Sequence, residues 1–388
     1  MRLIASPVLF IVILILLQGI NPYEATAQTA TQTLSVATLQ GAVIDSLTGN
    51  PLSEVHVFLS GSRHGAITDF SGRYRIRNIP PGVYRLIVSR IGYKREIKEI
   101  VIRPGTTPRF TIPMQPVVYK MGEIFAGDLG ERWERYLERF HELFIGTSKM
   151  ADSTRILNPE VLRFSRNWWG RFTAEALAPL KIENYALGYH ITYVLEEFYH
   201  SGTITRWDGN PHFTEMTPAT QEQAERWERN RSTAFYGSLR HFLIGLADET
   251  VSNEGFLIYE QPQRSMGYRS TMPRRIQPDR LITEQDNGFL YTVRFPGRIE
   301  IIYTEAGEDY RYIEWARNMG QAPARNQTSY LELNRRSITM DGDGEIRETY
   351  GATRFGYFSY KRVADQTPRD YRPATYRKQV EALATEGE

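Results

Sequence analysis

The first candidate for a catalytic or metal-binding site in this chain is a His-x-x-Glu pair, His212 and Glu215. A catalytic zinc ion is held by three protein ligands of this kind and keeps one open position for water. No third ligand can be placed, because the other histidines show no spacing that is typical of a zinc site. A four-residue match in a chain of 388 residues also arises easily by chance. The two residues are therefore weak metal candidates, and we predict no catalytic residue, no metal and no cofactor.

A second candidate site is the acidic run Asp341, Asp343 and Glu345, in which the carboxylates alternate with other residues. Carboxylates at this spacing could bind calcium, but the segment lacks the remaining ligands of a calcium-binding loop. Gly342 and Gly344 lie between the acidic residues and favour a tight turn between two strands. The interpretation that the sequence favours is a glycine-rich β-turn.

Composition excludes several further classes of function. The chain has no cysteine, which excludes thiol nucleophiles and cysteine-ligated zinc and means that stability comes without disulfides. No nucleophile elbow, phosphate-binding loop or dinucleotide-binding glycine fingerprint occurs. The formal net charge is +2, whereas a nucleic-acid binder needs a concentrated basic face. We therefore expect no nucleic-acid partner.

The first residues have the pattern of a secretory signal peptide. Met1 and Arg2 precede an uninterrupted apolar run over residues 8–17, and Ala25-Thr26-Ala27 forms a small-residue cleavage site. The apolar run is shorter than the roughly 20 residues that a spanning helix needs, so retention as a membrane anchor is the weaker alternative. We predict a signal peptide over residues 1–27 and an exported protein, located in the periplasm, at the outer membrane or on the cell surface.

Residues 33–118 have the pattern of an antiparallel β-sandwich, in which short alternating runs are separated by turn residues. The run over residues 83–90 alternates only in part, which predicts a central strand. Residues with special backbone preferences separate the runs and are assigned structural roles in turns. These turn residues are Gly49, Pro51, Asp69, Gly72, Pro81 and Gly82.

The same region resembles the carboxypeptidase regulatory-like domain family. The resemblance implies a seven-stranded, transthyretin-like and carbohydrate-binding-like sandwich. Modules of this family are accessory and non-catalytic in peptidases, in surface proteins and at the front of outer-membrane TonB-dependent receptors, so the fold does not fix the function. The motifs that carry the resemblance are Gly41-x-Val43-x-Asp45-x-x-Thr48-Gly49-x-Pro51-Leu52, Gly65-x-x-Thr68-Asp69-x-x-Gly72-x-Tyr74 and Ile79-Pro80-Pro81-Gly82-x-Tyr84-x-Leu86.

The resemblance raises one enzymatic alternative, a zinc carboxypeptidase-like hydrolase that would use His212 and Glu215. In those peptidases the third zinc ligand is a histidine much further along the chain, whereas the last histidine here is His241. The regulatory-like module also follows the catalytic domain in those enzymes, and here it comes first. The third ligand is therefore missing, and the enzymatic alternative is the weaker one.

Residues 119–375 read as an α+β domain. An amphipathic helix is expected over residues 128–146, with an aromatic stripe that we assign to a core. A hairpin is expected to turn at Asp208-Gly209-Asn210, followed by one helical stretch from Thr217 to about residue 248 and then by mostly β structure. Residues 376–388 are polar and are expected to form a disordered tail.

The sequence thus predicts a β-sandwich N-terminal domain followed by an α+β domain, in an exported envelope protein of a gram-negative-type cell. The predicted function is non-catalytic binding of a protein or glycan partner, and peripheral outer-membrane association is one way of attachment. The remaining alternative is an accessory component of an outer-membrane TonB-dependent uptake system. The helical stretches argue against the barrel itself, because barrels are built from regular amphipathic strands.

Overall fold

The computed structural model describes residues 36–117, 130–261, 273–285, 288–378 and 380. The predicted signal peptide, residues 1–27, lies outside this range. Among the described residues, no helix combines the length and apolar character that a membrane crossing requires. Val36–Glu388 forms one compact unit, so the domain boundaries expected at residues 118 and 375 stay predictions.

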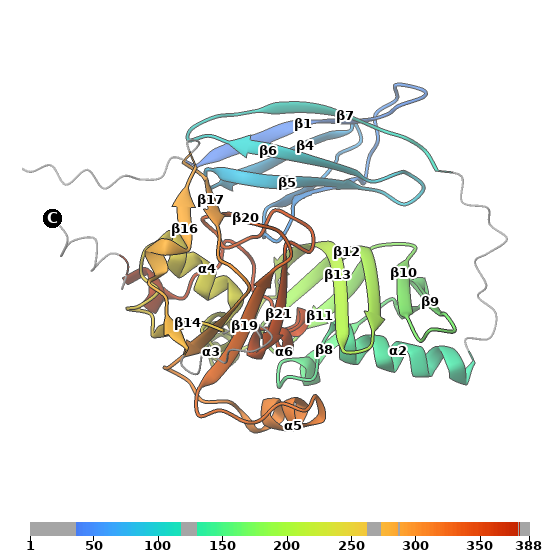
Figure 1. Cartoon of the computed structure of the whole chain (residues 1–388). Helices are drawn as coiled ribbons and strands as arrows, with labels where there is room; N and C mark the ends of the chain where they lie inside the picture. The colour runs from blue at the N-terminus through green and yellow to red at the C-terminus, as the bar shows by residue number, and fades with distance from the viewer. Residues whose placement is uncertain (1–35, 118–129, 262–272, 286–287, 379, 381–388) are drawn as a thin grey trace, which may run out of the picture. The chain divides into compact units, whose positions relative to one another are not determined.

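The first seven strands form the two sheets of a β-sandwich (Figure 1). One sheet has the order β4-β1-β7 and the other has the order β3-β2-β5-β6, and β1 runs parallel to β7. The predicted seven-stranded sandwich is confirmed. The strands are β1 (Ala37–Asp45), β2 (His56–Leu59), β3 (Gly65–Ile67), β4 (Arg73–Ile79), β5 (Gly82–Ser89), β6 (Glu96–Ile102) and β7 (Arg109–Met114).

Strand β5 is central in its sheet, as its incomplete alternation predicts. Leu86 and Val88 point into the core of the sandwich, where they are almost completely buried. Ile87 points to the opposite face and is equally buried, because it packs with Phe58 and with Val194 of the following region. A strand that is covered on both faces does not show a regular alternation of polar and apolar residues in its sequence.

Two of the predicted turn residues, Asp69 and Gly72, have clear structural roles in the turn before β4. Asp69 Oδ1 accepts hydrogen bonds from the backbone N–H groups of Ser71 and Arg73, at 2.8 and 2.9 Å. These bonds hold the pKa of Asp69 below its ordinary value. Gly72 has a φ of 70°, and a Cβ atom there would lie 2.6 Å from the carbonyl oxygen of Val43. Only glycine fits this turn without strain.

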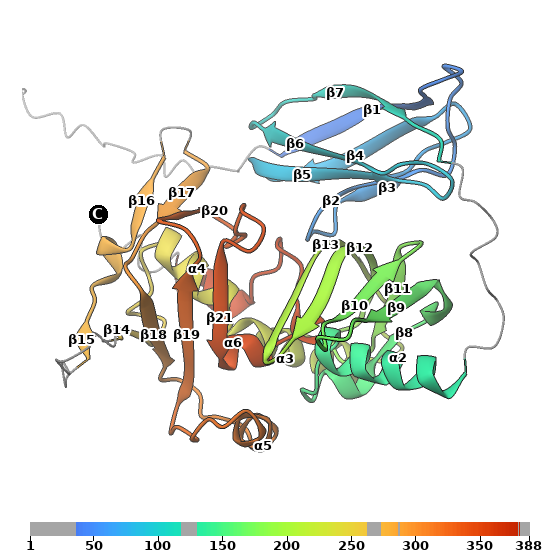
Figure 2. The same cartoon turned by 45° about the vertical axis from the view of Figure 1, so that its right-hand side comes forward.

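The next six strands form one sheet of the α+β region, with the order β8-β11-β12-β10-β9 and with β13 on the free side of β12 (Figure 2). Helix α2 (Glu131–Phe144) buries Phe140 and Phe144 against this sheet, so the aromatic stripe belongs to a core. The strands are β8 (Thr154–Ile156), β9 (Leu162–Arg166), β10 (Phe172–Ala176), β11 (Leu180–Asn184), β12 (Tyr189–Ser201) and β13 (Ile204–Glu215).

The hairpin turn expected at residues 208–210 was wrong, because those residues lie within β13. The chain turns instead around Gly202, which has a φ of 61°. Gly209 serves packing: a Cβ atom there would lie 2.4 Å from the ring of Tyr193 on β12. A glycine next to an aspartate therefore indicated a turn where the structure needs space for a ring.

Two further sheets and four helices make up the rest of the described α+β region. One sheet has the order β15-β14-β18-β19-β21 and the other has the order β16-β17-β20. The elements are α3 (Gln221–Phe235), α4 (Leu239–Ala247), β14 (Phe256–Glu260), β15 (Arg274–Arg275), β16 (Ile282–Glu284), β17 (Leu290–Val293), β18 (Arg298–Tyr303), α5 (Tyr310–Asn318), β19 (Gln327–Leu333), β20 (Ile338–Asp341), β21 (Ala352–Gly356) and α6 (Tyr357–Tyr360).

The single helix expected from Thr217 to residue 248 is two helices in the structure. Helix α3 is capped by Thr220, whose hydroxyl accepts from the N–H of Gln223, and α4 is capped by Ser238. Gly237 breaks the helical path between them with a φ of 66°. Its missing side chain leaves room for Tyr303, so the break is a packing requirement that local helix signals do not contain.

The segment after α6 runs back across the α+β region without regular strands. Asn184 is completely buried and donates from Nδ2 to the carbonyl of Ala364 at 2.9 Å, and Ser148 donates to Asp365. Tyr376 is also buried, and its hydroxyl donates to Asp248 Oδ2 at 2.7 Å. The tail expected from residue 376 thus begins inside packed structure, because the Tyr376 ring fills a core between α3 and α4.

Candidate functional site

The sandwich is joined to the α+β region through the loop after β2. The N–H of Gly61 donates to Pro211 O at 2.7 Å, and the N–H of Phe213 donates to Ser62 O at 3.0 Å. The N–H of Arg369, in the C-terminal segment, donates to Gly61 O at 2.7 Å. This loop is held by backbone bonds on two sides, and it forms one wall of the cavity described below.

Charged side chains strengthen the same junction. Arg63 pairs with Asp370, with Nε 2.7 Å from Oδ2, and with Glu215. Arg231 approaches the same Glu215 carboxylate at 3.7 Å. Both acidic side chains therefore have arginine partners. Glu215 links the α+β region to the sandwich through its ion pair with Arg63.

The structure does not bring His212 and Glu215 together as metal ligands. Both lie on β13, where residues three apart point to opposite faces. His212 packs against the ring of Phe58 with centroids 5.1 Å apart, and its Nε2 is buried without a hydrogen-bond partner among the described residues. Burial lowers the pKa of His212 to about 4. Across the described ranges no group of three His, Asp or Glu side chains is placed to hold a metal ion.

The acidic run at the end of β20 forms a turn. The guanidinium of Arg369 occupies the position that a bound cation would take in this turn. Asp341 Oδ1 accepts from the N–H groups of Asp343 and Glu345, which closes the turn. The guanidinium of Arg369 donates to Asp341 at 2.9 Å and to Asp343 at 2.8 Å. The sequence could not show this partner, because Arg369 reaches the turn from the C-terminal segment.

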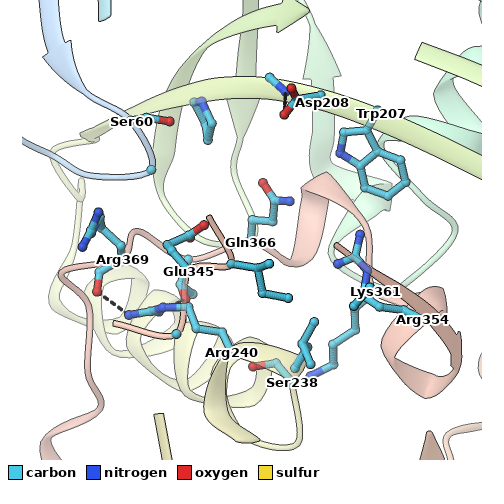
Figure 3. A pocket seen from close by; sticks show the side chains of 18 of the residues that line it. Ser60, Trp207, Asp208, Ser238, Arg240, Glu345, Arg354, Lys361, Gln366 and Arg369 are labelled. Carbon is cyan, nitrogen blue, oxygen red and sulfur yellow. Dashed lines mark hydrogen bonds between the residues drawn. The ribbon is translucent and has the colours of Figure 1, made fainter. Parts of the chain in front are cut away.

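A cavity of about 350 Å³ lies beside this turn (Figure 3). Its walls come from the loop after β2, from β12 and β13, from the start of α4, from residues 344–354 and from the C-terminal segment. Many of its lining side chains are charged. The cationic ones are Arg85, Arg240, Arg347, Arg354, Lys361, Arg362 and Arg369, and the anionic ones are Asp208, Glu345, Glu348 and Asp365.

Most of the lining cations have structural partners, and Arg347, for example, pairs with Glu99. Lys361 donates to the carbonyls of Thr233, Ala234 and Tyr236 at the end of α3, and burial lowers its pKa to about 8. Arg240 donates to the carbonyls of Asp343 and Tyr371, among others, and Arg369 holds the acidic turn. These groups hold the cavity wall together.

Two other cations, Arg354 and Arg362, meet at the ring of Trp207. Their guanidinium carbons lie 5.5 and 5.0 Å from the ring centre. In the part of the chain that the structure describes, no carboxylate forms an ion pair with either. Burial, with Arg354 as the second cause, lowers the pKa of Arg362 to about 9. Burial also lowers the pKa of Arg354, and the charge of Glu345 partly opposes that shift. The wall beside Trp207 thus carries two neighbouring cations, neither of which is paired directly with a carboxylate among the described residues.

The sequence does not predict this cluster, because no local spacing joins its members. Trp207 lies on β13, Arg354 on β21 and Arg362 just after α6. Arginine and tryptophan are also common surface and core residues when they are considered singly. The only signal in the sequence was an arginine on each side of the aromatic stretch at residues 355–360, which is too weak to define a site.

The fold and the cavity together define the class of protein. It is a β-sandwich module joined to an α+β domain, with a cavity that is lined by more cationic than acidic side chains. Residues 38–115 match the model of the carboxypeptidase regulatory-like domain family, which confirms the resemblance of the sandwich. No curated protein matches the chain. The comparison identifies the first module.

Solved structures with a similar sandwich include the major pilin subunit BcpA of Bacillus cereus, at 16% identity over 21% of this chain and 31% of the pilin, with a TM-score of 0.19. A type II cohesin–X-dockerin complex from Acetivibrio cellulolyticus is 19% identical over 26% of this chain and 70% of that chain, with a TM-score of 0.20. Catechol 1,2-dioxygenase from Acinetobacter is 15% identical over 23% and 55%, with a TM-score of 0.19. The chain thus spans about a third of the pilin's length, and scores this low carry no argument about function.

Proposed function

We propose that this chain is a non-catalytic exported protein that binds an anionic group of an envelope glycan in the cavity beside Trp207. The observation that carries the proposal is the pair Arg354 and Arg362, which share one aromatic ring and have no acidic partner among the described residues. A carboxylate, sulfate or phosphate would supply that missing charge. Arginine suits this role because its planar guanidinium binds such groups through two parallel hydrogen bonds.

The cavity supports a small polar ligand better than a folded protein surface. Its volume of about 350 Å³ lies at the lower end of the range of small-molecule sites. Side chains with hydrogen-bonding groups also line it, among them Ser60, Ser238 and Gln366 (Figure 3). A sugar ring with one acidic substituent matches both the size and the chemistry.

The lining groups that could do chemistry are engaged in structure, which supports a non-catalytic role. The Ser238 hydroxyl accepts the N–H of His241 as a helix cap. Asp365 accepts from Ser148, and Asp208 accepts from its neighbour Gly209 and from Thr349. Nucleophilic catalysis needs a hydroxyl in contact with a base, and the described lining residues show no such pair.

Export to the envelope is part of the proposal and is supported by the signal-peptide pattern of residues 1–27. An exported protein would meet acidic envelope glycans directly. The regulatory-like sandwich supports the accessory character, because it supplies one wall of the cavity through Ser60 and Arg85.

The test uses the mature protein, residues 28–388, and two sugars that differ in one group. Galacturonic acid carries a carboxylate where galactose carries a hydroxymethyl group. Calorimetric titration is expected to show saturable binding of galacturonate and none of galactose at the same concentration. Equal binding of both sugars would contradict the proposal. So would a protein that binds neither these two sugars nor any other acidic monosaccharide.

A further inference from the structure

A second surface with unusual chemistry lies at the turn between β9 and β10. The side chains of Trp168 and Trp169 are 81% and 73% exposed there. Large aromatic side chains are normally buried, so two adjacent exposed tryptophans require an explanation. The cavity does not account for them, because neither residue lines it.

The turn that carries the tryptophans is well defined. Asn167 Oδ1 accepts from the N–H of Arg171 at 2.9 Å, and the N–H of Gly170 donates to Asn167 O at 3.0 Å. Gly170 has a φ of 82°, and nothing lies within 4 Å of a Cβ atom built there. These hydrogen bonds close the hairpin, and both rings are exposed at its turn.

A second hairpin tip lies beside the first. Phe172, the first residue of β10, pairs with His200 near the end of β12, so the turn before β10 and the turn after β12 lie at the same edge of the sheet. Ile204, at the start of β13, is 42% exposed at that edge. Trp168, Trp169 and Ile204 together are called the tryptophan edge below.

Cationic residues outnumber acidic ones around the tryptophan edge. Strands β9 and β10 and the turn between them, residues 162–176, contain Arg163, Arg166 and Arg171 and one acidic residue, Glu175, which lies opposite Arg163. Arg171 is stacked over Tyr199 with its guanidinium carbon 4.2 Å from the ring centre, and it lies 4.0 Å from Glu197. Arg166 is exposed and next to the turn. Exposed tryptophans flanked by arginines match the headgroup region of a bilayer with anionic lipids.

We propose that the tryptophan edge docks on a lipid surface that carries anionic headgroups. The rings enter the interface between headgroups and acyl chains, and Arg166 contacts lipid phosphates. Tryptophan is enriched at that interface because its ring is apolar and its N–H is polar. A bilayer is favoured over a glycan because the rings lie at a projecting turn instead of along a groove. This surface acts independently of the cavity.

The test is co-sedimentation of the mature protein with vesicles of phosphatidylcholine alone or with phosphatidylglycerol added. We expect binding to the anionic vesicles that weakens as salt is raised. The double variant Trp168→Ala/Trp169→Ala should lose binding about tenfold or more, and Arg166→Gln should lose part of it. The control is Phe70→Ala, which removes a 96% exposed ring from the turn before β4 and should leave binding unchanged.

Several outcomes would overturn the inference. The first three are unchanged vesicle binding by the double variant, loss of binding in the Phe70→Ala control, and equal binding to neutral and anionic vesicles. The fourth is a soluble glycan or protein that binds the two tryptophans and displaces the vesicles. Circular dichroism of each variant establishes that it is folded. If a variant fails to fold, quenching of wild-type tryptophan fluorescence by brominated lipid gives the second measurement: quenching supports docking, and its absence contradicts it.

Discussion

The guanidinium of Arg369 lies 2.9 Å from Asp341 Oδ2, and both side chains are only 3% exposed. This ion pair joins the C-terminal segment to the turn after β20, beside the cavity. Arg369 also contacts the sandwich, since it donates to Val83 O at 3.3 Å and lies over the ring of Tyr84. One buried side chain thus links three parts of the fold that are distant in sequence.

Replacing Arg369 with methionine is expected to destabilise the protein by about 3–5 kcal/mol, because it leaves buried carboxylates without their partner. Urea unfolding of the mature protein measures the change. Arg372→Met is the matched control, since Arg372 pairs with the same Asp343 but is more exposed. The prediction fails if the two variants lose equal stability.

The buried His212 predicts a loss of stability in acid. Its pKa is near 4 when folded and about 6.5 when unfolded, so the unfolded chain binds the proton more readily. Stability is therefore full above about pH 6.5 and falls as the pH is lowered towards 4, by about 2 kcal/mol between pH 7 and pH 5 for this group. Burial also lowers the pKa values of His56 and His64, while Asp370 opposes the shift of His64.

The measurement is the free energy of unfolding at pH 7 and at pH 5, for wild type and for His212→Gln. The variant removes one titrating group, so its stability should change less between the two pH values. The neighbouring histidines leave part of the dependence in place. An identical pH dependence in the variant would show that His212 is not the group responsible.

Gly188 gives a test of close packing in the α+β region. It has a φ of 71°, and a Cβ atom there would lie 2.3 Å from the ring of Trp227. Gly202 has a φ of 61° with open space around it, so Gly202→Ala measures backbone strain alone. We expect Gly202→Ala to cost about 1 kcal/mol and Gly188→Ala to cost several times more. Equal losses in thermal unfolding would contradict the packing that the structure shows.

Export is tested by the mass of the protein that is recovered from an envelope fraction. Cleavage after Ala27 is expected to leave Gln28 as the first residue, because the preceding segment has the order of a signal peptide. A chain lacking residues 2–27 should remain in the cytoplasm. Recovery of full-length protein with an intact Met1 in the membrane fraction would support the anchor alternative instead.

The sandwich could be predicted from the sequence because its signals are local. Asp69 and Gly72 form their turn with near neighbours, and β1 shows its buried face as apolar residues at alternate positions, such as Ala37 and Leu39. The same local reasoning placed a turn at Asp208 and Gly209, where tertiary contacts decide otherwise. Space for the Tyr193 ring is a property of the folded sheet, and a single sequence does not contain it.

The candidate site could not be predicted for the same reason. Trp207, Arg354 and Arg362 become neighbours only when β13, β21 and the C-terminal segment have packed. The His212 and Glu215 pair was the opposite case, since its residues are close in sequence but point to different faces of one strand. Spacing along a chain indicates a site only when the local structure is known.

The most direct test of the central claim compares galacturonate binding to three forms of the mature protein by calorimetric titration. These are wild type, the double variant Arg354→Gln/Arg362→Gln, and the control Arg75→Gln, which removes an exposed arginine from β4. We expect saturable binding of galacturonate by wild type and by the control, and an affinity lower by about tenfold or more in the double variant. Binding that survives the double substitution, in a variant whose thermal unfolding matches wild type, would contradict the claim.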